Sequence, residues 1–163
     1  MTQDKIDKIL TQWKRESPQL DLSSLAVIGR ILQLSRLLEK QRESVLVDFD
    51  LTLWSFDMLA TLRRQGPPYQ LKPTELYGLL MLSSGAMTNR IDRLEKAGLV
   101  TRLRDPNDRR SVTVQLTNKG LEQVDNVMPV LFEQENQLLE ILSKTETKML
   151  ISLLKKFLDT MNS

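Results

Sequence analysis

The chain has 163 residues, of which 40% are hydrophobic and 27% charged, and its formal net charge of +2 is ordinary for one globular domain. It contains neither cysteine nor histidine, which excludes disulfides, thiol chemistry, cysteine-rich zinc sites and the serine–histidine–aspartate triad. No apolar run is long enough to span a bilayer and the first residues lack the core of a signal peptide, so we expect a cytoplasmic protein without a membrane anchor.

Two amphipathic helices are predicted at the start of the chain. Apolar residues at helical spacing indicate a first helix over residues 4–16, which ends before Pro18 because the residue before a proline is pushed out of the helical conformation. Asp21 or Ser23 can cap a second, longer helix. We therefore expect residues 1–48 to supply an extra N-terminal helix and a dimerisation helix.

Three shorter helices are predicted next. Thr52 can cap a helix that the Gly66-Pro67-Pro68 turn stops. Pro73 is tolerated at the first position of a brief helix. Ser83 or Ser84 can cap a third helix that ends at Gly98, because glycine readily adopts the left-handed conformation found at helix C-termini.

The period of the apolar residues then changes from helical to two. Residues 99–104 and 111–116 are typical of short strands. The loop between them, residues 105–110, contains proline, asparagine and aspartate, which favour turns. We expect these two strands to form a hairpin.

Two helices are predicted at the C-terminus, over residues 118–142 and 145–161. Thr117 can cap the first, and Pro129 is expected to kink it. Together they carry more leucine than a lone protomer needs, and packing against the N-terminal helices, within the chain or across a two-fold axis, would bury it. A homodimer is the simpler arrangement. The apolar residues concerned are Leu138, Leu139, Leu142, Leu150, Leu153, Leu154, Phe157 and Leu158.

The order of these elements predicts a mainly α fold with a small β wing. Two short helices followed by a hairpin are the outline of a winged helix-turn-helix, which we place at residues 49–116. Dimerisation helices flank it in residues 1–48 and 117–163, and the whole is expected to form one compact domain.

The second helix of such a pair enters the DNA major groove and presents its N-terminal residues to base edges. In this chain that helix covers residues 84–94, with Ile91 and Leu94 facing inward. The side chains that face outward suit bases and phosphates. They are Ser84, Thr88, Asn89, Arg90 and Arg93.

Basic residues concentrate in the same region. Between Ser84 and Arg110 there are seven basic residues and four acidic ones, whereas from Leu121 onward four lysines stand against seven carboxylates. Arg109 and Arg110 lie at the expected loop tip, where arginine suits a narrow minor groove. This distribution and the outward helix face together predict double-stranded DNA as the partner.

Several motifs of the chain occur together in one known family. Asp108-Arg109-Arg110 and the later run Leu116-Thr117-Asn118-Lys119-Gly120 match a D-x-R…LTxxG signature, and the match extends back through residues 71–76 and 89–100. From about residue 50 to residue 120 the chain resembles MarR-type regulators. The resemblance implies a homodimer that represses nearby genes from a pseudo-palindromic operator and releases DNA when a small, often phenolic or aromatic anionic ligand binds.

A narrower resemblance concerns the ligand. The extra N-terminal helix, residues 56–64 and the Gly66-Pro67-Pro68 turn look like the PecS/HucR branch of the family, which responds to urate. The resemblance implies urate or a related purine as ligand. By position, the ligand-binding residues of that branch fall on Trp13, Asp57, Arg64 and Arg102.

The chemistry of these four residues is consistent with that ligand. Asp57 and Arg64 are seven residues apart and therefore share one helix face. An arginine can donate two parallel hydrogen bonds to an oxyanion while the indole of Trp13 stacks on a planar ring. Asp57 and Arg102 could pair across to the wing, either within the ligand site or as a structural salt bridge.

Other interpretations stay open. A MarR-type regulator of efflux or stress genes could respond to phenolic or hydrophobic drug-like ligands, in a pocket lined by Met58, Met81 and Met87. A winged-helix module could instead bind protein or RNA, and would then not need a symmetric dimer. An enzyme is disfavoured because no nucleophile motif or phosphate-binding glycine loop occurs, and we expect no catalytic residue, cofactor or metal.

Overall fold

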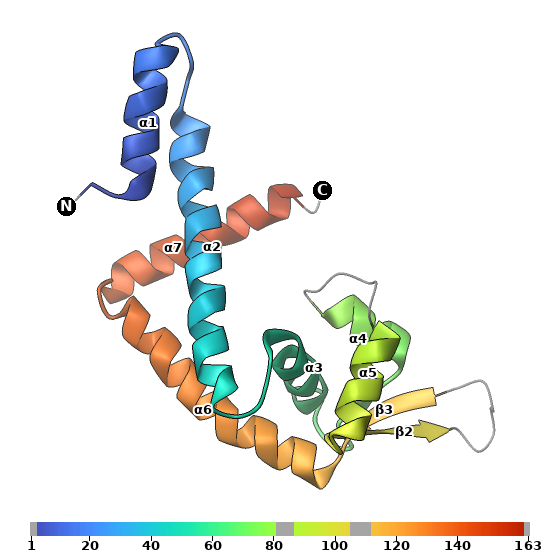
Figure 1. Ribbon diagram of the computed structural model, residues 1–163. Coiled ribbons are helices and arrows are strands. Elements are labelled where there is room, and N and C mark those ends of the chain that lie inside the picture. The colour runs from blue at the N-terminus through green and yellow to red at the C-terminus, as the bar shows by residue number, and fades with distance from the viewer. Residues whose placement is uncertain (1–2, 81–86, 105–111, 162–163) are drawn as a thin grey trace. The chain divides into compact units, whose positions relative to one another are not determined.

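The computed structural model describes residues 3–80, 87–104 and 112–161 (Figure 1). These residues are mostly helical and include a small three-stranded antiparallel sheet, which confirms the predicted fold class. The chain forms two compact units, Met1–Leu53 and Trp54–Ser163. In the described ranges, no helix is both long and apolar enough to cross a membrane.

The first unit consists of helices α1 (Lys5–Glu16) and α2 (Ser23–Val47). Asp4 caps α1, since its carboxylate accepts hydrogen bonds from the backbone N–H groups of Ile6 at 2.7 Å and Asp7 at 2.9 Å. Before α2, the Asp21 carboxylate accepts from the backbone N–H of Ser23 at 2.9 Å. Both helices therefore begin where acidic side chains satisfy their first free N–H groups.

An ionic and an apolar contact hold α1 against α2. The Arg30 guanidinium of α2 lies 2.8 Å from the Asp4 carboxylate and 2.6 Å from that of Asp7. Ile6 is buried, and a Cβ atom on Gly29 would lie only 3.2 Å from its Cδ1 atom. The missing side chain at residue 29 thus lets the two helices approach closely.

The second unit contains five helices and the sheet among its described residues. The strand order is β1-β3-β2, and β3 pairs with β2 from Arg102 opposite Val114 to Val100 opposite Leu116. The elements are α3 (Leu53–Arg63), β1 (Gln70–Leu71), α4 (Pro73–Leu79), α5 (Met87–Lys96), β2 (Val100–Arg104), β3 (Val112–Leu116), α6 (Asn118–Leu139) and α7 (Lys144–Met161).

The buried side chains of this unit come from helices α3, α4, α5 and α6 and from strands β2 and β3. Helices α4 and α6 contact β3, and α5 contacts β2. The apolar side chains that are almost fully buried are Phe56, Met58, Leu59, Leu62, Leu76, Ile91, Leu94, Val100, Val114, Val124, Val127 and Leu131. This core fixes α5 and the strands of the wing as one packed module.

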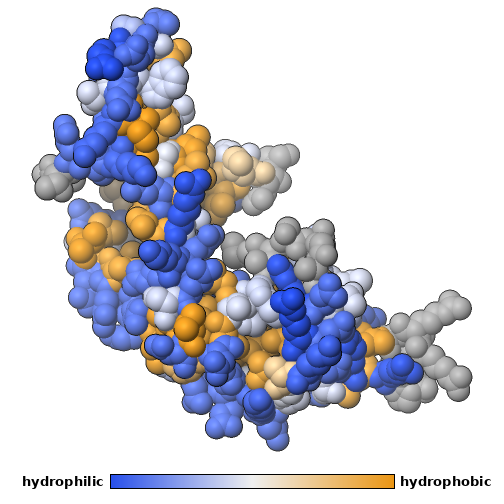
Figure 2. Space-filling model, viewed as in Figure 1, coloured by the Kyte–Doolittle hydropathy of each residue, from blue (hydrophilic) through white to orange (hydrophobic). Residues whose placement is uncertain are grey.

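The C-terminal helices leave much apolar surface uncovered. Helix α6 continues through Pro129 to Leu139, three residues short of the predicted end, and no residue of α7 is buried. Helix α2 also exposes apolar side chains, among them Leu34, Leu37 and Leu38. Figure 2 shows apolar patches on α2 and near the junction of α6 and α7.

Candidate nucleic-acid interface

Helix α5 presents a polar face to solvent. Ile91 and Leu94 are buried, as expected, while Thr88, Asn89 and Arg93 are exposed. The three exposed side chains can bond to base edges and phosphates. Ser84 and the arginines Arg109 and Arg110, which the sequence also predicts as DNA contacts, lie outside the described residues.

Arg90 departs from the predicted outward orientation. Its guanidinium carbon lies 5.7 Å from the centre of the Trp54 ring on α3, within reach of a cation–π interaction. Its Nη1 atom is buried and has no hydrogen-bond partner among the described residues. The physical reason is its position beside Ile91, at the edge of the buried face of α5. Arg90 therefore ties α5 to α3 in this structure.

The Leu116–Gly120 motif anchors the end of α5 to the start of α6. The Thr117 hydroxyl donates to the Gly98 carbonyl at 2.7 Å and accepts from the Gly120 N–H at 3.0 Å, which confirms Thr117 as a helix cap. Lys119 donates to the Ala97 carbonyl at 2.8 Å. A Cβ atom on Gly120 would lie 2.0 Å from the Leu99 carbonyl oxygen, so only glycine fits there.

Arg102 joins the wing to α5. Its guanidinium donates to the carboxylates of Asp92 and Glu95, and its backbone N–H donates to Glu95 Oε1 at 2.9 Å. Partial desolvation lowers the pKa of Arg102, but the two carboxylates outweigh it and hold that pKa above its usual value. The predicted partner was Asp57, whereas the ion pairs found here lie within the α5–β2 pair.

The other predicted ligand residues lie on several elements. Trp13 is on α1 in the first unit, with 47% of its surface exposed. Asp57 is half-buried in the middle of α3. Arg64 directly follows α3, and its Nη2 atom donates to the Leu79 carbonyl at 3.1 Å. The end of α3 is thereby joined to the end of α4, a contact that spacing within one helix could not reveal.

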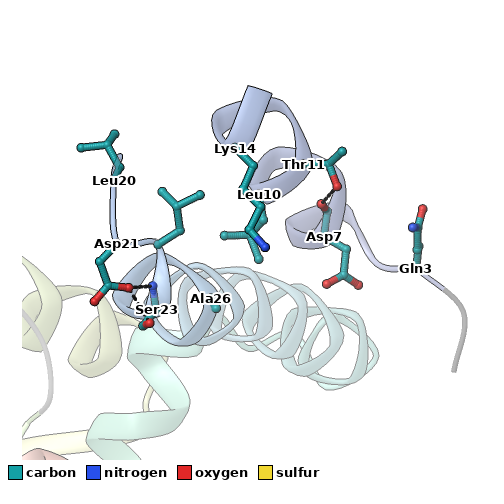
Figure 3. A pocket seen from close by; sticks show the side chains of 10 residues that line it. Gln3, Asp7, Leu10, Thr11, Lys14, Leu20, Asp21, Ser23 and Ala26 are labelled. Carbon is teal, nitrogen blue, oxygen red and sulfur yellow. Dashed lines mark hydrogen bonds between the residues drawn. The ribbon is translucent and has the colours of Figure 1, made fainter. Parts of the chain in front are cut away.

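Sequence reasoning missed a pocket in the first unit. A cavity of about 630 Å³ lies between α1 and the start of α2. Figure 3 shows Leu10 and Lys14 reaching from α1 toward α2, and Asp21 at the other side. Asp7, Leu10, Thr11 and Lys14 recur at i, i+3, i+4 and i+7, which is the signal that could have located this face. None of the four predicted ligand residues is among the described residues that line it.

Comparison with known proteins identifies transcriptional regulators as relatives. The pattern of the MarR family matches residues 51–112. The chain is 37% identical to the HTH-type transcriptional regulator PecS of Dickeya dadantii (strain 3937) over 150 residues, which cover 92% of this chain and 90% of the relative.

Two solved structures resemble the fold closely. AbsC, a MarR family transcriptional regulator from Streptomyces coelicolor, superposes with a TM-score of 0.77 at 26% identity, over 88% of this chain and 97% of AbsC. A mutant MarR from E. coli complexed with operator DNA superposes with a TM-score of 0.71 at 30% identity, over 85% of this chain and 99% of that one.

Proposed function

The chain belongs to the MarR family and is a DNA-binding transcriptional regulator, and on this premise we propose that it represses its target genes as a homodimer on a pseudo-palindromic operator. The observation that carries the proposal is α5, which exposes Thr88, Asn89 and Arg93 while burying Ile91 and Leu94. Such a helix suits the major groove. The chain acts through DNA and is not an enzyme.

The homodimer is supported by apolar surface that a monomer leaves in water. Leucines of α2 and α7 are about half-exposed, and α7 buries none of its side chains. Two copies related by a two-fold axis would cover these faces and would present two α5 helices to successive major grooves. A regulator of this kind must reach the chromosome, so we also propose a cytoplasmic location.

We propose urate or a related purine anion as the ligand that releases DNA, bound by Trp13, Asp57, Arg64 and Arg102. Similarity to PecS over most of the chain supports this choice. Trp13 and Arg64 are exposed, so an indole face and a guanidinium are open to a planar anion. To engage Arg102, the ligand would have to compete with Asp92 and Glu95.

A phenolic or drug-like ligand is the second candidate, and the structure favours it less. Its expected pocket includes Met58, Met81 and Met87. Met58 is fully buried in the core, so it could line a pocket only if that core opened. Met87 is half-buried, and Met81 lies outside the described residues.

The test titrates purified protein with a labelled duplex selected from a random pool, with and without urate, and with a hydroxybenzoate as comparator. We expect urate to weaken DNA binding by several-fold to about a hundredfold, the range typical of allosteric coupling. Arg64→Ala should abolish this response and leave DNA affinity within about threefold, because the lost contact at Leu79 is a single hydrogen bond.

Arg63→Ala is the matched control. Arg63 pairs with Asp125 at 2.7 Å and lies over the Tyr69 ring, so its loss should lower stability while the urate response persists. Release by the hydroxybenzoate alone would replace urate by the second candidate. If neither compound changes DNA binding or tryptophan fluorescence, the ligand proposal fails while the proposal of DNA binding stands.

A further inference from the structure

The wing strand β2 and helix α5 are joined by three charged side chains, here called the Arg102 clamp: Arg102, Asp92 and Glu95. We propose that Arg102 is a positioning residue for DNA binding, which fixes the orientation of α5 against the wing and offsets part of the negative charge of the two carboxylates that α5 carries. This role differs from ligand binding and does not depend on the nature of any ligand.

In the clamp, Arg102 of β2 contacts two carboxylates of α5 at the same time. One terminal guanidinium nitrogen of Arg102 donates a hydrogen bond to each carboxylate. Glu95 also accepts a hydrogen bond from the backbone N–H of Arg102. Asp92 and Glu95 are three residues apart and so share one face of α5. Because β2 is an edge strand, its outward N–H would otherwise lack a partner, and Glu95 supplies one.

The charges of α5 show why the clamp bears on DNA binding. The helix carries Arg90, Arg93 and Lys96, which favour phosphate, and Asp92 and Glu95, which oppose it. An unpaired carboxylate near the DNA backbone is repelled by it. Arg102 pairs with both and offsets one of their two negative charges. Its own side chain is only 28% exposed, so solvent screens the pairs less than it would on an open surface.

The same contacts distinguish positioning from direct phosphate binding. Both terminal nitrogens of Arg102 already donate to carboxylates, which makes the guanidinium less available to form paired hydrogen bonds with a phosphate. Loss of Arg102 should therefore weaken DNA binding through a loosened helix and two released carboxylates. Specific binding should suffer more than non-specific binding, because only the former needs α5 at a defined angle.

The test is a cycle of four full-length proteins: wild type, Arg102→Ala, Asp92→Asn/Glu95→Gln, and the combined triple variant. Each is titrated with a duplex selected by the wild type and with a random duplex, at several salt concentrations. We expect Arg102→Ala to weaken specific binding about two- to tenfold, as for a partly exposed pair network. In that background the neutral amides should restore part of the affinity, because they remove the released charges but not the looseness of the helix, whereas in the wild type they should not raise it.

Three further measurements serve as controls. Arg102→Lys should lie between wild type and Arg102→Ala, since a lysine cannot brace two carboxylates at once. Arg15→Ala, which removes one exposed positive charge from α1, should leave specific binding unchanged. Circular dichroism should show folded protein throughout; if Arg102→Ala unfolds, Arg102→Lys takes its place in the cycle.

Two outcomes would overturn the proposal. The amide substitutions could change affinity by the same factor with and without Arg102, which would mean that the residues act independently. Alternatively, Arg102→Ala could reduce the slope of log K against log salt by about 0.9, the value for one lost phosphate contact. In the second case Arg102 would be a phosphate ligand and not a brace.

Discussion

Gly120 shows how one residue of the family motif acts through sterics. It follows the cap of α6 and lies so close to the Leu99 carbonyl that an added methyl group would overlap it. The carbonyl belongs to the turn that leads from α5 into β2, so the backbone at residue 120 fixes where that turn passes. A side chain there would push α6 away from α5 and the wing.

We predict that Gly120→Ala lowers the free energy of unfolding by about 1–3 kcal/mol or more, as for overpacking against a rigid neighbour. Gly78→Ala is the matched control. Its Cβ atom would meet no described residue within 4 Å, so the helical preference of alanine should stabilise the protein by about 0.5–1 kcal/mol. Urea unfolding at one fixed protein concentration measures both changes. Equal effects at the two glycines would contradict this account of Gly120.

Arg90 and Arg102 show the limit of sequence reasoning at this scale. Helical spacing correctly predicted that Ile91 and Leu94 are buried and that Thr88, Asn89 and Arg93 are exposed. It could not predict that Arg90 lies over Trp54, because that ring comes from α3, 36 residues earlier in the chain. Nor could it choose among the carboxylates near Arg102. Charge partners depend on tertiary contacts, which periodicity does not contain.

At the scale of elements, ion pairs contribute to the attachment of α1 to α2, beside the apolar contact of Ile6. Asp4 caps α1 and, with Asp7, binds Arg30. The hydrogen bond from the Asp7 backbone, followed by the contact with Arg30, holds the pKa of Asp4 below its usual value. A lowered pKa in the folded state means that the contact stabilises above the ordinary pKa and is lost as pH falls through the lowered one.

We predict that α1 loosens from α2 on acidification, below about pH 4, the usual pKa of an aspartate. In a Trp54→Phe background Trp13 is the sole tryptophan and reports on α1 by its fluorescence. Asp4→Asn should shift its signal at neutral pH toward that of the acidified protein. Glu146→Gln removes another carboxylate of lowered pKa, at the start of α7, and should leave the Trp13 signal unchanged. A Trp13 signal in Asp4→Asn that matches the parent at pH 7 would contradict the role of the Asp4 charge, since asparagine can still cap the helix.

The boundaries of the elements were predictable where a local signal exists. Thr117 as a cap, Pro73 at the start of α4 and the two strands of the wing were all predicted within a residue or two. Strand β1 was missed because two residues carry no period, and it forms only by pairing with β3, more than forty residues later. Its existence is a property of the sheet and not of its own sequence.

At the scale of the whole molecule, helix α7 exposes leucines that a helix packed within one protomer would bury. Leu153 and Leu154 are 58% and 41% exposed, and no side chain of the helix is buried. An apolar face of this length is costly in water, by about 25 cal/mol for each Å². A second copy is the partner that we propose for it, through an interface on the order of 2,000 Å².

The proposed dimer makes a joint prediction about mass and DNA. Removal of residues 145–163 should yield a monomer by sedimentation equilibrium and abolish tight operator binding, because one α5 helix cannot span two half-sites. The full chain should protect two half-sites about 34 Å apart, one turn of DNA. Leu153→Arg/Leu154→Arg tests the same face without truncation; both side chains are exposed in one chain, so folding should survive while dimerisation fails. Lys148→Ala, on the same helix, should leave mass and footprint unchanged. A folded monomer that binds the operator at full affinity, or a footprint of a single half-site, would refute the two-fold arrangement.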